Sequence, residues 1–369
     1  MSVFGTRPEA IKMAPLVKCI NSTGGFVGKV CVTAQHREML DQIMMFFGIS
    51  ADYDLDLMCH KQTLTSITAN ILKGLTEIFI NDRPDIVLVH GDTTTSFAAA
   101  LAAFYQQIPV GHVEAGLRTN NIYAPFPEEV NRQLIARLAT LHFCPTDLNV
   151  QNLLKENITK HVYKTGNTII DALNTTIREN YVFKDLKLRK ISFSSGRIIL
   201  LTVHRRENLG ALRQIFSAIL AIVDAFPDTQ VIYPVHKNPA VFNVAYEVLG
   251  SHSRIHLLDS IDVEDMHNLL SQVYLVLTDS GGLQEEAPAL GKPVLVLRAE
   301  TERPEAVAAG VVRIVGVEAP KIIKATSQLL TCNREYLQMS QVVNPYGDGH
   351  ASERICQAIT QYFKTSATL

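Results

Sequence analysis

Residues 86–94 read IVLVHGDTT, an apolar run that passes directly into a polar loop containing glycine. Residues 273–282 repeat this organisation, with the apolar run VYLVL followed by TDSGG. Short apolar runs bounded by turn residues are typical of strands that are buried on both faces of a parallel sheet. The two stretches therefore predict a parallel sheet in each half of the chain.

Similar apolar runs occur along the whole chain and alternate with helix-length segments, which is the pattern of βαβ units. We expect strands at Val30–Thr33, Ile86–His90, Pro109–Val113 and Leu141–Cys144, and then at Ile198–Val203, Gln230–Val235, Val273–Leu277, Pro293–Leu297 and Val311–Val315. The fold class is α/β, with two Rossmann-like doubly wound sheets. A chain of 369 residues exceeds the roughly 100–200 residues of one domain, and we expect the junction near Arg178–Gly196.

The composition excludes several classes of function. With a net charge of −2 and no block of Lys or Arg, the chain lacks the signature of a nucleic-acid or membrane-surface protein. No apolar stretch has the length of a membrane span, and no signal peptide is visible, which predicts a cytoplasmic protein. The six cysteines form no metal-binding pattern, and no P-loop or GxGxxG motif occurs, so we expect no metal and no cofactor.

The second half carries a candidate anion site. Ser280, Gly281 and Gly282 follow a predicted strand and open a helix, where free backbone N–H groups favour phosphate. Serine and glycine also cap helices that bind nothing, so the motif alone leaves both readings open. Glu286 on the following helix could accept hydrogen bonds from ribose hydroxyls, and Arg303 could reach the same ligand.

The first half carries cations and carboxylates in the corresponding loops. Arg7 and Lys12 lie at the start of a helix and could bind phosphate, or they could be solvated. Asp92, Glu114 and Glu128 each follow or begin an element, and as a set they favour acid/base chemistry over capping.

A neighbouring arginine completes this set. Glu128 and Arg132 are four residues apart, so we expect them to share a helix face and pair, with Glu129 pointing into solvent.

Eight runs of sequence, spread over essentially the whole chain, resemble the non-hydrolysing UDP-N-acetylglucosamine 2-epimerases. They are Val3–Pro15 (VFGTRPEAIKMAP), Thr33–Gln42 (TAQHREMLDQ), Val89–Thr95 (VHGDTTT), Gly111–Arg118 (GHVEAGLR), His204–Asn208 (HRREN), Thr278–Pro288 (TDSGGLQEEAP), Thr301–Glu305 (TERPE) and Asn344–Gly349 (NPYGDG).

The resemblance implies a GT-B fold, in which two Rossmann-like domains face a central cleft. It places residues 1–175 and a returning carboxy-terminal segment, residues 351–369, in a sugar-binding domain, and residues 176–350 in a UDP-binding domain. It also implies reversible C2 epimerisation of UDP-GlcNAc and UDP-ManNAc, through elimination of UDP to 2-acetamidoglucal and re-addition. The product would supply ManNAc units for cell-surface polysaccharide.

The family's functional residues carry over by motif. The resemblance implies that Asp92, Glu114, Glu128 and His204 are catalytic, with Arg132 orienting Glu128. The substrate-binding set is Arg7, Lys12, Arg132, His236, Ser280, Gly281, Gly282, Glu286 and Arg303.

The resemblance further implies a homodimer and, in some members, activation by a second UDP-GlcNAc. The corresponding positions are Gln35, Glu38, Lys61 and His236, of which Glu38 and Lys61 depart from the expected Gln and Arg.

Three alternatives stay open at this point. They are a UDP-sugar glycosyltransferase on the same fold, a hydrolysing 2-epimerase, and a nucleotide-sugar-binding regulator without turnover.

Overall fold

A computed structural model describes residues 1–34, 37–57, 63–194 and 196–366, and the chain separates into two compact units. The first unit comprises Met1–Ala172 and Tyr346–Leu369, and the second comprises Leu173–Pro345. The resemblance implies boundaries at residues 175 and 350, and the junction expected near Arg178–Gly196 lies inside the second unit. The first observed boundary falls within helix α7 (Thr168–Thr176), and the second falls within the NPYGDG segment.

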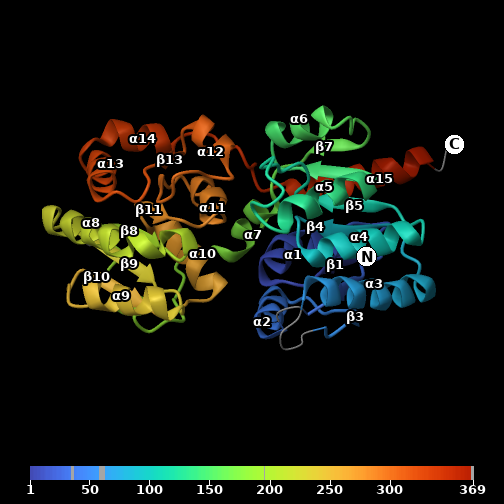
Figure 1. Ribbon diagram of the computed structural model, residues 1–369, viewed down its shortest axis with the longest axis horizontal. Coiled ribbons are helices and arrows are strands. Elements are labelled where there is room, and N and C mark those ends of the chain that lie inside the picture. The colour runs from blue at the N-terminus through green and yellow to red at the C-terminus, as the bar shows by residue number, and fades with distance from the viewer. Residues whose placement is uncertain (35–36, 58–62, 195, 367–369) are drawn as a thin grey trace. The chain divides into compact units, whose positions relative to one another are not determined.

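Within the described residues, the first unit forms a seven-stranded sheet in the order β3-β2-β1-β4-β5-β6-β7 (Figure 1), and its paired strands are parallel. The strands are β1 (Ser2–Phe4), β2 (Val30–Val32), β3 (Tyr53–Asp54), β4 (Val87–His90), β5 (Val110–Val113), β6 (Leu141–Cys144) and β7 (Val162–Lys164). The helices are α1 (Arg7–Ser22), α2 (Arg37–Phe47), α3 (Leu64–Asn81), α4 (Thr94–Tyr105), α5 (Glu128–Leu138), α6 (Asp147–Lys155) and the returning α15 (Ala351–Ser366), with α7 beginning in this unit.

The second unit forms a six-stranded sheet, again of the residues described, in the order β10-β9-β8-β11-β12-β13, and its paired strands are also parallel. The strands are β8 (Arg197–Thr202), β9 (Thr229–Pro234), β10 (Ile255–Leu258), β11 (Leu275–Thr278), β12 (Val294–Val296) and β13 (Val312–Ile314). The α-helices are α8 (Leu212–Ala225), α9 (Pro239–Leu249), α10 (Val263–Gln272), α11 (Leu283–Ala289), α12 (Pro304–Ala309), α13 (Ala319–Thr331) and α14 (Asn333–Ser340), and the 3-10 helices are η1 (Leu188–Lys190) and η2 (Arg206–Ala211).

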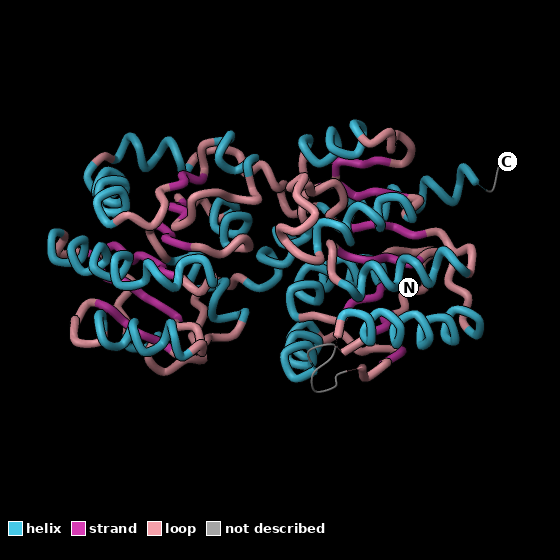
Figure 2. Tube along the Cα trace, viewed as in Figure 1, coloured by secondary structure: helices cyan, strands magenta, loops and turns pink. Residues whose placement is uncertain are grey.

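In each unit the strands, magenta in Figure 2, run between helices, and β1, β4, β5 and β11 are buried along their whole length. One helical run, Arg206–Ala225, has the length and apolar composition of a membrane span. Its α8 part packs Ile215, Phe216, Ile219 and Ile222 into the core of the second unit with no side-chain exposure. This run is therefore a core helix, because burial against the sheet accounts for its apolar face. The two predicted doubly wound sheets are confirmed.

Each sheet reverses its strand order at one place, between β1 and β4 in the first unit and between β8 and β11 in the second. In doubly wound sheets, ligands bind beyond the carboxyl ends of the strands at this switch point. The loops that follow these four strands lead to Arg7, Asp92, His204 and Ser280, which makes each switch point the place to examine for a site.

Candidate functional site

A buried carboxylate joins the two loops at the first switch point. Glu9 of α1, with 2% of its surface exposed, accepts hydrogen bonds on Oε2 from the backbone N–H of Gly5 (3.1 Å) and from both the N–H (2.8 Å) and hydroxyl (2.7 Å) of Thr6. Its Oε1 accepts from the hydroxyls of Thr93 (2.6 Å) and Ser96 (2.9 Å). Glu9 therefore fixes the loop after β1 against the loop after β4, and sequence reasoning had not singled it out.

Asp92 follows β4 and is held by two residues of α5. Arg132 Nη2 lies 2.5 Å from Asp92 Oδ2, and Asn131 Nδ2 donates to the Asp92 backbone carbonyl at 2.8 Å. Burial raises the pKa of the Asp92 carboxyl to about 6; Arg132 opposes this rise, while the charges of Glu114 and Glu128 add to it. A carboxyl with this pKa can exchange a proton near neutral pH.

The expected pair of Glu128 and Arg132 is wrong. Arg132 pairs instead with Asp92 and, through Nη1 at 3.3 Å, with Glu129 Oε2. Glu129 was expected to point into solvent, but it is fully buried. Its carboxylate accepts hydrogen bonds from the backbone N–H groups of Thr119 (3.0 Å) and Asn120 (3.2 Å). Arg132 therefore orients Asp92 rather than Glu128.

Glu128 begins α5, and its Oε2 atom is buried without a hydrogen-bond partner in the structure. Leaving a buried carboxylate oxygen unsatisfied is unfavourable, and such atoms cluster at functional sites. This oxygen is therefore available to a ligand, which agrees with the predicted role of Glu128 and does not require Arg132.

Glu114 follows β5 and is approached by donors from three elements. Lys12 of α1 forms an ion pair with Oε1, and Asn167, the residue before α7, donates from Nδ2 to the same oxygen at 2.9 Å. His90 Nε2, at the end of β4, lies 3.7 Å from Oε2. Lys12 was expected to face a phosphate, whereas here it pairs with a carboxylate of the same unit; Arg7 opens α1 and is half-buried.

Asp279, which follows β11, organises the loops at the second switch point. Its carboxylate accepts the backbone N–H groups of His204 (2.9 Å) and Arg205 (2.8 Å) and the side-chain amide of Asn208 (3.0 Å). His204 Nδ1 lies 3.2 Å from Asp279 Oδ1. Burial acts to raise the pKa of Asp279, but the hydrogen bonds from His204 and Arg205 outweigh it and hold this pKa below its ordinary value.

The ring of His204 stacks on the ring of His236, with centroids 5.5 Å apart and an interplanar angle of 14°. The backbone N–H of Asn238 donates to His236 Nδ1 at 3.1 Å. Burial and the neighbouring His204 lower the pKa of His236, which favours a neutral imidazole at this position. The two predicted histidines therefore lie together beside Asp279.

Two arginines converge on Gly281, the second residue of the Ser280–Gly282 segment. A Cβ atom added to Gly281 would lie 3.8 Å from Arg205 Nη2 and 3.9 Å from Arg303 Nη2. Arg303 is oriented by an ion pair from its Nε to Glu285, which is 1% exposed. Two guanidinium groups beside a glycine backbone are suited to an anion, and of these two arginines only Arg303 was expected from the sequence.

Glu286 lies on the same helix, α11, and its Oε2 is 3.8 Å from Nε2 of the buried His267. His267 Nδ1 lies 2.7 Å from the hydroxyl of Thr176. Glu286, which was expected near a ribose, is partly exposed, whereas its neighbour Glu285 is buried in the ion pair with Arg303.

The remaining predicted positions lie elsewhere. Gln35 and Lys61 are outside the residues that the structure describes, as is the side chain of Glu38. Across the described part of the chain, no group of three or more His, Cys, Asp or Glu side chains is placed to hold a metal ion.

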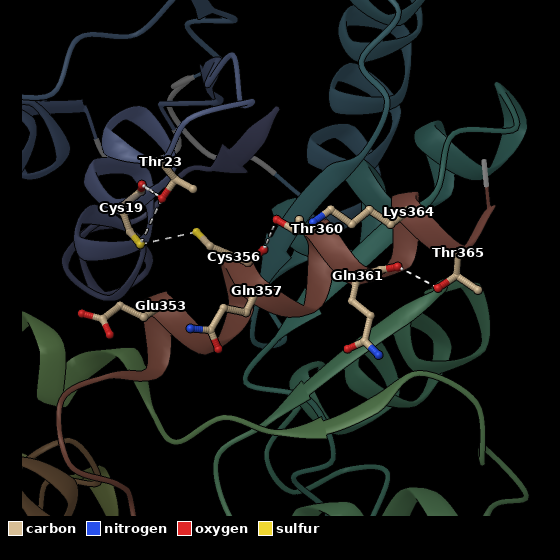
Figure 3. A pocket seen from close by; sticks show the side chains of 9 residues that line it. All are labelled: Cys19, Thr23, Glu353, Cys356, Gln357, Thr360, Gln361, Lys364 and Thr365. Atoms are coloured by element: carbon tan, nitrogen blue, oxygen red, sulfur yellow. Dashed lines mark hydrogen bonds between the residues drawn. The ribbon is translucent and has the colours of Figure 1, made fainter. Parts of the chain in front are cut away.

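Two cavities of the first unit are separate from the switch point. One of about 610 Å³ is lined by α1 and α15, where Cys19 Sγ and Cys356 Sγ lie 3.4 Å apart (Figure 3). Another of about 750 Å³ is lined by residues that include Met1, Val27 and Pro84. None of the candidate residues described above lines either cavity.

Comparison with known proteins gives a consistent result. A model of the family described as UDP-N-acetylglucosamine 2-epimerase matches residues 18–360. The chain is 53% identical over 365 residues to the UDP-N-acetylglucosamine 2-epimerase of Bacillus subtilis, covering 98% of this chain and 95% of that protein. It is 50% identical over 368 residues to the enzyme of the same name from Escherichia coli K12, covering 97% of each.

Solved structures agree. The UDP-GlcNAc 2-epimerase of Neisseria meningitidis bound to UDP-GlcNAc is 47% identical, with a TM-score of 0.88 over 98% of this chain and 99% of that one. The UDP-GlcNAc 2-epimerase of Methanocaldococcus jannaschii in complex with UDP-GlcNAc and UDP is 32% identical, with a TM-score of 0.79 over 98% and 99% of the two chains.

Proposed function

This chain belongs to the UDP-N-acetylglucosamine 2-epimerase family, and from that premise we propose that it interconverts UDP-GlcNAc and UDP-ManNAc by the non-hydrolysing route. Loss of the C2 proton and of UDP gives 2-acetamidoglucal, and UDP then adds back to C1 while a proton is delivered to the opposite face of C2, which inverts its configuration. The observation that carries this proposal is the Asp92 carboxyl, which Arg132 holds at the switch point of the first unit and whose pKa burial raises to about 6.

The chemistry requires proton transfer to be coupled to loss of UDP. The C2 hydrogen of the sugar is not acidic, so its removal becomes feasible only as the C1–O bond breaks and the diphosphate takes up negative charge. We assign Asp92 as the base for UDP-GlcNAc and Glu128, with its unsatisfied buried oxygen, as the group that protonates the other face of C2. Glu114, paired with Lys12, completes the set.

The second unit supplies the stabilisation of the leaving group. The guanidinium groups of Arg205 and Arg303 at Gly281 can stabilise the negative charge that develops on the diphosphate. Because this interaction is stronger in the transition state than in the bound substrate, it lowers the activation barrier. Glu286 is placed to accept hydrogen bonds from the ribose. His204, held by Asp279, would approach the diphosphate. Arg7 is the cation that the first unit contributes.

Product analysis distinguishes this proposal from its alternatives. After incubation with UDP-GlcNAc in D2O, NMR should show both UDP-sugars with deuterium at C2 and no loss of total UDP-sugar. Free ManNAc together with an equal amount of UDP would instead indicate a hydrolysing enzyme. An unchanged substrate would indicate a binding protein without turnover or a glycosyltransferase that lacks its acceptor.

The pH dependence of kcat/KM should reveal Asp92. Its raised pKa means that the carboxyl holds its own proton at pH 5 and is ionised by pH 7, so kcat/KM with UDP-GlcNAc should fall as the pH is lowered through about 6. Initial rates between pH 4.5 and 8.5 measure this limb. If Asp92→Glu leaves the midpoint unchanged, the limb belongs to another group.

We also propose a regulatory role for a second UDP-GlcNAc, in line with the two ligands named for the Methanocaldococcus jannaschii structure. Consumption of UDP-ManNAc should then depend sigmoidally on its concentration and become hyperbolic when a little UDP-GlcNAc is added. Initial-rate measurements in both directions test this, and hyperbolic kinetics without the addition would contradict it.

Four further expectations stay predictions. They are the cleft between the domains, the homodimer, the cytoplasmic location and the supply of ManNAc to polysaccharide.

A further inference from the structure

Asn167 is a buried amide that connects Glu114 to the start of α7. Its Oδ1 accepts the backbone N–H of Ile169 at 3.1 Å, which is the contact of a helix-capping side chain. Because the oxygen is engaged in this way, the Nδ2 group points to Glu114 and donates to Oε1 at 2.9 Å. Only 3% of the surface of Asn167 is exposed, so the orientation of the amide is determined by the protein.

The returning segment holds the backbone of Asn167 in place. The N–H of Asn167 donates to the carbonyl of Tyr346 at 2.7 Å. Gly166 has a φ of +90°, and a Cβ on Gly347 would lie 3.1 Å from Gly166 Cα, so the two glycines allow the backbones to approach closely. Residues of the NPYGDG run, to which the proposed chemistry assigns no role, therefore fix the residue that contacts Glu114.

We propose that Asn167 is a positioning residue for the epimerisation, which holds the Glu114 carboxylate in its working orientation through Oε1 and is itself held by the returning segment at Tyr346. This inference rests on the proposed function, and it extends the site to a residue that acts through Glu114.

The charges around Glu114 explain why an amide is suited to this position. Lys12 of α1 and Asn167 both approach Oε1, while His90 of β4 lies near Oε2. Asp92 and Glu114 also interact electrostatically. A neutral donor stabilises the ionised form of Glu114 without adding a charge, whereas another carboxylate at this point would repel it.

Asn167→Asp separates positioning from folding. Aspartate caps a helix as well as asparagine does, so α7 should form normally, but an oxygen would replace the N–H that Glu114 accepts. We expect kcat to fall by about 10-fold or more, with KM for UDP-GlcNAc changed by less than about 3-fold, because removing one charge-assisted hydrogen bond disturbs the geometry of a reacting group. The acidic limb of the pH profile should also move to higher pH.

The matched control is Asn333→Asp. Asn333 is an exposed residue in the first turn of α14, so this variant makes the same chemical change at a helix start far from Glu114 in sequence. It should leave kcat, KM and the pH profile unchanged. Asn167→Ser, which keeps a capping hydroxyl but is too short to reach Glu114, should lower kcat without moving the acidic limb as far as Asn167→Asp does.

A double-mutant cycle with Glu114→Gln supplies a readout that does not depend on turnover. At pH 8, Asn167→Asp should lower Tm by a few degrees in the wild-type background and by clearly less in Glu114→Gln, because the repulsion needs both carboxylates. A wild-type protein that does not epimerise UDP-GlcNAc would refute the proposed function, and the positioning role with it. An active wild type combined with a wild-type kcat in Asn167→Asp, or with additive Tm changes, would overturn the positioning role alone.

Discussion

Asp92→Asn is expected to reduce kcat by about 10²-fold or more while the affinity for UDP stays within about 2-fold. The amide keeps the shape of the side chain and can still contact Arg132, but it cannot accept the C2 proton. The diphosphate contacts proposed for Arg205 and Arg303 lie in the other unit and should be unaffected. Steady-state kinetics and isothermal titration calorimetry with UDP measure the two quantities.

The same substitution should stabilise the protein at neutral pH. The pKa of Asp92 is raised from 3.8 to about 6, so the folded state disfavours the ionised carboxylate. Between about pH 4 and pH 6 the unfolded state releases this proton more readily than the folded state, and the free energy of unfolding therefore falls as the pH rises through this range. We expect Tm of Asp92→Asn to exceed that of the wild type at pH 7.5 and to match it near pH 4.

Asp147→Asn, at a carboxylate of which 73% is exposed in its pair with Lys164, is the control and should change neither quantity. A kcat of Asp92→Asn within a few-fold of the wild type would remove Asp92 from the proton transfer.

Arg303→Met should weaken UDP binding by about 10- to 100-fold and lower Tm as well. The first effect follows from loss of a guanidinium at Gly281, and the second from loss of the cation that faces the buried Glu285. Calorimetry with UDP and thermal melts measure the two effects separately.

A second substitution separates these causes. Adding Glu285→Gln to Arg303→Met removes the buried charge and should recover much of the lost Tm, but it should not restore UDP affinity. Recovery of UDP binding in the double variant would show that Arg303 acts only by holding α11. Arg313→Met, at a half-exposed ion pair with Glu335 in the same unit, should have little effect on either measurement.

Every central strand except β1 (Ser2–Phe4), which has only three residues, could be predicted, whereas three edge strands could not. Ile199, Leu200 and Leu201 of β8 are fully buried, and such continuous apolar runs are visible in a sequence. In contrast, β3 consists of only Tyr53–Asp54, and β7 (Val162–Lys164) is half-exposed at the edge of its sheet. β10 (Ile255–Leu258) also lies at an edge and includes a histidine. Edge strands depend on pairing with a neighbour more than on burial, and this pairing leaves little trace in local composition.

The residues of the site also fall into those that could be predicted from the sequence and those that could not. Residues that follow buried strands, such as Asp92 and Glu114, could be located because the carboxyl ends of parallel strands meet at one edge of the sheet. The partner of Arg132 could not, because helical spacing favoured Glu128, whereas the tertiary structure supplied Asp92. Glu9 and Asn167 were missed for a related reason, since their donors come from segments distant in sequence.

Positional isotope exchange tests the central claim most directly, namely that UDP leaves the sugar during epimerisation. UDP-GlcNAc carrying 18O in the bridge between C1 and the β-phosphorus is incubated with the protein and followed by 31P NMR. If the C1–O bond breaks, the β-phosphate can rotate, and the label should scramble into the non-bridging positions as fast as UDP-ManNAc appears. A label that stays in the bridge while the two sugars reach equilibrium would contradict the elimination mechanism.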